Sequence, residues 1–244
     1  MALLEVRDVV KTYGGIVAVN RASFDVEEGS ITALIGPNGA GKTTAFDTIC
    51  GVVVPDSGSI RLGGKDITGL MSHVITKEGL GRTFQITREL GDMTVLENMV
   101  VSTVPNSLGS LLGGRMSPDE RRKAMDLLAF VGIDRLAHEP AKRLSYGQRK
   151  LLEFASVLMS DPRLVLLDEP AGGVNPALLE RIMDRIEEIN RRGTTFLIVE
   201  HNMDVVMRLS HSVIVMAHGQ VILQDTPRAV QADERVLDAY LGDV

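Results

Sequence analysis

The stretch that decides the fold of this 244-residue chain is Gly36-Pro37-Asn38-Gly39-Ala40-Gly41-Lys42-Thr43-Thr44. An apolar run at 31–35 precedes it and a helix-forming run at 45–50 follows it, which gives the order strand, glycine-rich turn, helix. The stretch meets the pattern G-x-x-x-x-G-K-[ST] in full, so it predicts a phosphate-binding P-loop. A loop with few Cβ atoms can wrap closely enough for its N–H groups to converge on an anion.

Each part of this motif has a chemical reason. The helix that begins near Lys42 directs the positive end of its dipole at the phosphates. Lys42 adds a mobile positive charge for the β- and γ-phosphates, and Thr43 adds a hydroxyl for Mg²⁺. The alternative is a glycine turn with a solvated lysine, and the strand and helix beside the loop argue against it.

The composition limits the class of protein. The chain is long enough for one large α/β domain or a core with a subdomain, and its formal charge of −6 argues against a dedicated nucleic-acid binder. A single cysteine, Cys50, excludes an internal disulfide, and the five histidines form no metal-ligand spacing. No run approaches a membrane span or a signal peptide. We expect a soluble, cytoplasmic protein whose membrane role comes through partners.

The pattern along the chain predicts three regions. Apolar and polar residues alternate over 3–13 and 16–26, and two such strands ahead of a P-loop indicate an antiparallel sheet beside a parallel core. Residues 86–160 carry helix patterns, among them 94–101 and 117–131, so we expect a helical subdomain inserted there. Tyr13 ends the first strand, where it could stack on a purine base or serve as a half-buried strand aromatic.

Two buried strands end in polar residues. The run 163–167 leads to Asp168 and Glu169, and the run 194–199 leads to Glu200 and His201. Ligands bind at the carboxyl ends of the strands in open α/β sheets, so these groups are well placed for a Mg²⁺-nucleotide. We expect Asp168 to hold Mg²⁺ through water, Glu169 to polarise the attacking water and His201 to meet the γ-phosphate.

Taken together, the motifs resemble those of the ATP-binding-cassette (ABC) ATPases over nearly the whole chain. Gly36 to Thr44 is similar to the Walker A motif, and Leu164 to Asp168 to Walker B with Glu169 in the catalytic position. Gln85 resembles the Q-loop glutamine, Leu144 to Gln148 the LSGGQ signature, His201 the switch histidine and Tyr13 the adenine-stacking aromatic. The resemblance implies a RecA-like α/β core with an antiparallel β-subdomain and a helical subdomain.

Two positions depart from the common family pattern. The signature has Tyr146 where glycine is commonest, and the loop after Walker B has Asn175 where aspartate is usual. Both departures are similar to the residues found in the larger ATPase of branched-chain amino acid importers. Four further segments resemble that subfamily: 81–85, the extra loop near 103–116, 169–176 and the ending at 239–242. Urea or amide importers and lipopolysaccharide exporters share parts of this pattern, and they stay open as alternatives.

The resemblance also implies a mechanism. Two cassettes close on ATP and Mg²⁺, with Ser145, Gly147 and Gln148 of one subunit over the P-loop of the other. Gln85 joins Thr43 and Asp168 as a metal contact and joins Lys42, Glu169 and His201 in catalysis. The implied partners are transmembrane permease subunits, a second ATPase subunit and, indirectly, an extracytoplasmic solute-binding protein, with the cassette at the cytoplasmic face of the membrane.

Two functions from other classes compete with a transporter. A soluble ABC ATPase acting on DNA or the ribosome usually has two cassettes in one chain or a long coiled-coil insertion, and neither is present. A regulatory module without turnover does not need the intact Glu169 and His201. We therefore expect an ATPase coupled to transport and no nucleic-acid partner.

Overall fold

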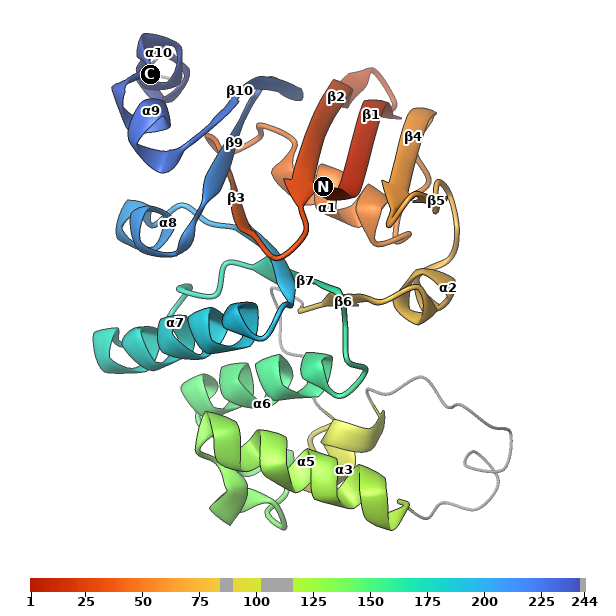
Figure 1. The fold of residues 1–244 in the computed structure, drawn as a ribbon, viewed down its shortest axis with the longest axis vertical. Helices are drawn as coiled ribbons and strands as arrows, with labels where there is room; N and C mark the ends of the chain where they lie inside the picture. Colours follow the sequence, from red (N-terminus) through yellow and green to blue (C-terminus); the bar gives the residue numbers. More distant parts are fainter. Residues whose placement is uncertain (84–89, 102–115, 242–244) are drawn as a thin grey trace.

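The computed structural model describes residues 1–83, 90–101 and 116–241 and contains two sheets (Figure 1). The larger sheet has the order β10-β9-β3-β8-β7-β6; it is parallel except for β10, which pairs antiparallel with β9 at one edge. Its strands are β3 (Ile31–Ile35), β6 (Leu80–Arg82), β7 (Leu164–Asp168), β8 (Thr195–Val199), β9 (Ser212–Ala217) and β10 (Gln220–Asp225). The three central strands are buried along their whole length because both faces of the sheet are covered.

The smaller sheet is antiparallel, with the order β2-β1-β4-β5. Its strands are β1 (Ala2–Tyr13), β2 (Ile16–Glu27), β4 (Ser57–Leu62) and β5 (Lys65–Asp66). Helix α1 (Lys42–Ile49) lies between the two sheets, and its buried Phe46 and Ile49 share one core with residues of both. The P-loop that precedes α1 is therefore fixed between the sheets.

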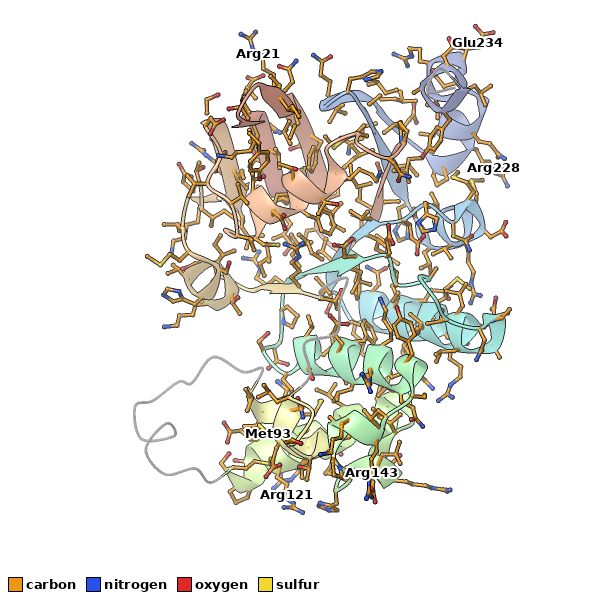
Figure 2. All side chains as sticks on the ribbon, turned by 180° about the vertical axis from the view of Figure 1, so that it is seen from behind. Arg21, Met93, Arg121, Arg143, Arg228 and Glu234 are labelled. Atoms are coloured by element: carbon orange, nitrogen blue, oxygen red, sulfur yellow. The ribbon has the colours of Figure 1, made fainter. Side chains whose placement is uncertain are left out.

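Helices cover the opposite face of the larger sheet. Helices α6 (Tyr146–Leu158) and α7 (Pro176–Arg191) share a core there with α3 (Val95–Val101) and α5 (Pro118–Val131). Figure 1 shows α3, α5 and α6 together at the end of the molecule far from the antiparallel sheet. In Figure 2, Arg121 and Arg143 project outward at this end.

The remaining helices are short. They are α2 (Ser72–Lys77), α8 (Met203–Leu209), α9 (Pro227–Ala232) and α10 (Glu234–Leu241), with 3₁₀ turns at Asp134–Leu136 and Ala141–Arg143. Parts of α8, α9 and α10 pack with β3 and β9 in a third cluster. Within the described residues, no helix is both long and apolar enough to cross a membrane.

The predicted fold class is confirmed, and most elements lie within a few residues of their expected limits. The sequence pattern predicts a helix from Gln148 to Ser160, and helix α6 begins two residues earlier, at Tyr146, because the cap is Ser145. Helix α9 was not predicted; Thr226 caps it and Pro227 occupies its first turn. The sequence pattern also predicts a strand over 81–85, and the structure shows a strand at Leu80–Arg82. Phe84, Gln85 and the loop at 102–115 lie outside the described residues. The limits 86–160 of the helical subdomain stay a prediction.

Candidate nucleotide-binding and catalytic site

Two glycines of the P-loop occupy backbone conformations and spaces that other residues cannot share. Gly36 has φ +148°, and a Cβ there would overlap the carbonyl oxygen of Met216 on β9. Gly41 has φ +95°, and a Cβ there would overlap the carbonyl oxygen of Ala18 on β2. The loop is thus held closely between the two sheets, and its glycines are required by this packing.

The start of α1 offers donors for an anion. Gly41 is its N-cap and has no side chain to bond the first-turn N–H groups, which have no partner within the helix itself. Asn38, Gly39 and Thr43 are exposed at the same place. This cradle fits a phosphate, which would accept from the loop and helix amides and lie at the positive end of the helix dipole.

The Lys42 ammonium group donates to the carbonyl oxygens of Gly36 and Pro37, at 2.7 and 2.8 Å. Partial burial lowers the pKa of Lys42, and the negative charges of Glu169 and Asp168 oppose that effect. Because both carboxylates act on this ammonium, the structure brings Walker A and the end of β7 into one electrostatic site.

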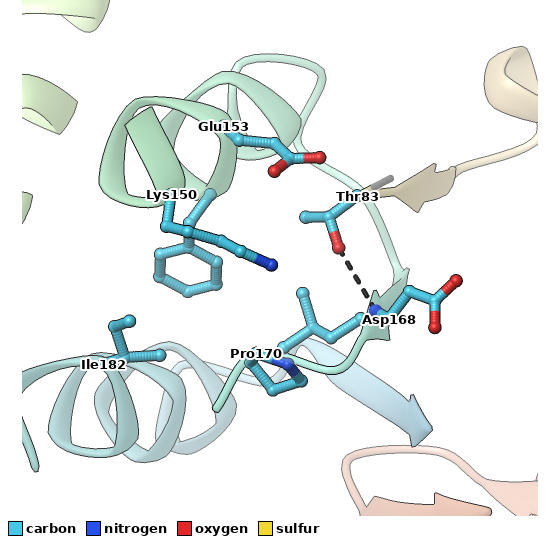
Figure 3. Close-up of a pocket in the computed structure, with 8 residues that line it drawn as sticks. Thr83, Lys150, Glu153, Asp168, Pro170 and Ile182 are labelled. Atoms are coloured by element: carbon cyan, nitrogen blue, oxygen red, sulfur yellow. Dashed lines mark hydrogen bonds between the residues drawn. The ribbon is translucent and has the colours of Figure 1, made fainter. Parts of the chain in front are cut away.

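Asp168 ends β7 as a carboxylate that is only 5% exposed. Its burial raises its pKa, while the Arg82 guanidinium, whose Nη2 lies 3.6 Å from Oδ2, acts in the opposite direction. Its backbone N–H donates to the Thr83 hydroxyl (Figure 3). The described residues contain no group of three carboxylate, histidine or cysteine side chains able to hold a metal. A Mg²⁺ ion here would need phosphate oxygens as further ligands, as is usual for Mg²⁺-nucleotides.

Glu169 and His201 are brought together from neighbouring strands. Oε1 of Glu169 lies 3.6 Å from Nδ1 of His201. Glu169 has φ +47°, a left-handed conformation that costs energy for a residue with a side chain, and its N–H donates to the carbonyl oxygen of Val199 at 3.0 Å. This backbone turn sends the Glu169 side chain toward the loop that carries His201.

The signature residues lie at the start of α6, on the face of the sheet opposite to α1. Ser145 and Gln148 form a capping box, in which each side chain accepts from the backbone N–H of the other residue. A hydroxyl that accepts in this way can still donate its proton, so an exposed Ser145 can both cap the helix and bind an anion. A Cβ at Gly147 would overlap Leu178 of α7, so glycine permits this close helix contact.

Three comparisons bear on this site. Residues 19–172 match the family model described as ABC transporter, and residues 220–244 match the model described as branched-chain amino acid ATP-binding cassette transporter. This chain belongs to the ABC transporter family. It is an ATP-binding cassette, and the chemistry of the family is ATP hydrolysis coupled to transport.

Individual relatives agree over the full length of the cassette. It is 40% identical to a probable branched-chain amino acid transport ATP-binding protein LivG of Archaeoglobus fulgidus, over 99% of this chain and 96% of the relative. It is 36% identical to the high-affinity branched-chain amino acid transport ATP-binding protein BraF of Pseudomonas aeruginosa, over 99% and 98%. A crystal structure of a cassette in its ADP conformation superposes with a TM-score of 0.89, at 34% identity and 99% coverage of both chains.

Sequence reasoning missed two residues that build the cassette's site. Arg82 joins α1 to β7, because its Nη1 lies 2.6 Å from Asp47 Oδ1 and its Nη2 faces Asp168. Lys150 of α6 is buried beside the end of β7 (Figure 3). Its Nζ donates to the carbonyl oxygen of Glu169 at 3.5 Å. The available sequence signals were a basic residue at the end of a short apolar strand, for Arg82, and a basic residue on the buried face of a helix, for Lys150.

The other predicted positions are placed as follows. Tyr13 ends β1 and is 48% exposed, with Lys11 Nζ 5.5 Å from its ring centroid. Tyr146 donates its hydroxyl to the carbonyl oxygen of Gly172 at 3.1 Å, so this departure from the family pattern links the signature to the loop after β7. Asn175 caps α7 by accepting from the N–H of Leu178. Gln85 lies outside the described residues.

Proposed function

We propose that this cassette is the ATP-hydrolysing subunit of an importer of branched-chain or related amino acids. The observation that carries the proposal is the match of its last 25 residues, 220–244, to the model of that subfamily. The names of full-length relatives at 36–40% identity support the same solute class. The cassette itself supplies energy rather than solute recognition.

The first part of the proposal concerns nucleotide binding. The Walker A backbone from Gly36 to Thr44 surrounds the phosphates of ATP, and Lys42 moves from its loop carbonyls onto them. Thr43, Asp168 and Gln85 would hold Mg²⁺, and the ion would supply positive charge to the phosphate oxygens. The exposed ring of Tyr13 stacks on the adenine.

The second part concerns hydrolysis. Glu169 polarises a water for in-line attack on the γ-phosphate, and His201 contacts the same phosphate, with Gln85 completing the site. The 3.6 Å between the Glu169 and His201 side chains supports joint action on one phosphate. Lys42 stabilises the charge that develops on the phosphate oxygens.

The third part concerns assembly. Two cassettes close on ATP, and Ser145, Gly147 and Gln148 of the partner subunit cover the γ-phosphate with the N-terminus of α6. Solved cassette dimers that are 26% identical to this chain support such a closure. The expected partners are two transmembrane permease subunits and a second ATPase subunit, at the cytoplasmic face of the membrane, with a solute-binding protein on the other side.

The experiment that tests this function is a capture of partners. Tagged Glu169→Gln cassette, which should keep ATP bound, is isolated in Mg-ATP from the cells that naturally make it, and the chains captured with it are identified. The same complex is then prepared with wild-type cassette, and its ATPase activity is measured with and without leucine. Two permease chains, a second cassette and stimulation by a branched-chain amino acid support the proposal. Partners of a lipopolysaccharide exporter, stimulation only by urea or amides, or recovery of nucleic acid or ribosomes would overturn it.

A further inference from the structure

Glu200 is a buried carboxylate at the centre of the site, with 1% of the residue exposed. It lies between β8 and His201, and its backbone N–H points to the carbonyl oxygen of Leu34 on β3, at 3.4 Å. Burial of a carboxylate is expensive unless hydrogen bonds replace the lost water. Here three backbone N–H groups do so, which makes the placement of Glu200 specific.

The three donors come from two different loops. Oε1 accepts from the N–H of Ala171 at 2.9 Å, in the loop that follows β7. Oε2 accepts from the N–H groups of His201 and Asn202, at 2.8 and 2.9 Å, in the loop that follows β8. Each carboxylate oxygen therefore accepts hydrogen bonds from only one of the two loops.

Both loops carry a residue proposed to act on the γ-phosphate. Ala171 is two residues from Glu169, and the N–H of Gly172 donates to the carbonyl oxygen of Glu169 at 2.9 Å, so this loop forms a tight turn. On the other side, Asn202 caps α8. The hydrogen bond from the N–H of Ala171 thus holds the turn that directs Glu169. The hydrogen bond from the N–H of His201 holds the backbone from which the His201 side chain extends.

We propose that Glu200 is a positioning residue, which sets the 3.6 Å distance between Glu169 and His201 by holding both loops on one carboxylate. The inference rests on the catalytic roles proposed above for Glu169 and His201. Its physical basis is preorganisation, because a misplacement of about 1 Å in a reacting group can reduce the rate on the order of 100-fold.

The length of the Glu200 side chain is what links the loops, so it offers a sharp test. Glu200→Asp keeps the charge and can still accept from its own loop, as aspartate commonly does two residues ahead. Because its side chain is one methylene shorter, aspartate should lose the hydrogen bond from the N–H of Ala171. Glu200→Gln keeps the length but places an amide NH₂ group, which cannot accept, toward one of the two loops.

We expect full-chain Glu200→Asp and Glu200→Gln to reduce kcat about 10- to 100-fold while the Kd for a fluorescent ATP analogue stays within about twofold. In Glu169→Gln the added Glu200→Asp change should cost little more, because the lost contact with Ala171 acts through the loop that positions Glu169. Asp204→Asn, an exposed carboxylate in the next helix, is the matched control and should behave as wild type.

Three outcomes would overturn the inference: wild-type kcat in both Glu200 variants, parallel loss of kcat, nucleotide binding and thermal midpoint, or full additivity of Glu200→Asp with Glu169→Gln. These three results would remove the positioning role of Glu200 and leave the catalytic roles proposed for Glu169 and His201 in place. Wild-type turnover in Glu169→Gln and His201→Ala would remove their catalytic roles, whatever Glu200 does.

Discussion

Replacing Gly41 by alanine tests whether the P-loop is held by close packing against the antiparallel sheet. The residue has φ +95°, where a side chain costs roughly 1–2 kcal/mol. A Cβ there would also lie well inside 3.0 Å of the Ala18 carbonyl oxygen and 3.3 Å from Gly219 Cα. Since both neighbours are backbone, the loop or β2 has to shift by about 1 Å.

Such a shift moves the N–H groups that would bind phosphate. We expect Gly41→Ala to lower the free energy of unfolding by about 2 kcal/mol and to raise the Kd for a fluorescent ATP analogue on the order of 100-fold. Urea unfolding and equilibrium fluorescence titration measure the two effects separately.

Gly64→Ala is the matched control for strain alone. Gly64 has φ +79°, and no atom lies within 4 Å of an added Cβ, in the turn between β4 and β5. It should lose roughly 1–2 kcal/mol of stability without a change in the Kd. Unchanged nucleotide affinity in Gly41→Ala would refute the argument that this contact positions the P-loop.

Three further predictions follow from the site. Lys42→Ala should lose nucleotide binding. Glu169→Gln should bind ATP but hydrolyse it on the order of 10²–10⁴-fold more slowly, as measured by phosphate release. Normal turnover in either variant would place the chemistry at other residues. Ser145→Arg should leave nucleotide binding by the monomer intact but block ATP-driven dimerisation in sedimentation, and a normal dimer would exclude the contact in trans. Burial raises the pKa of Asp168, so protons should displace Mg²⁺ at a higher pH than from an exposed aspartate. The Mg²⁺ concentration for half-maximal ATPase should accordingly rise as pH falls, and a constant value down to the usual aspartate range would contradict this.

The parts of the site that could be predicted from sequence are those with local chemistry. The P-loop motif, the acids at the end of β7 and the helix caps each depend on residues a few positions apart, so their patterns are visible in a linear sequence. The strand-end rule then predicted that residues 168–169 and 201 would meet. The structure confirms the arrangement of these strands and places Glu169 beside His201.

The parts that could not be predicted depend on side-chain contacts between distant segments. Arg82 bridges Asp47 and Asp168, and Glu200 joins Ala171 to its own loop. Such contacts follow from the order of strands in the sheet and from the turn at Glu169, neither of which has a local sequence signal. The roles of Tyr146 and Asn175 likewise became clear only from their hydrogen bonds to Gly172 and Leu178.

The measurement that tests the central claim most directly is uptake of radiolabelled leucine by cells that depend on this cassette. We predict that wild-type cassette supports concentrative uptake and that Glu169→Gln, expressed at the same level, does not. Leucine uptake that continues unchanged with Glu169→Gln as the only form of the cassette would contradict the account.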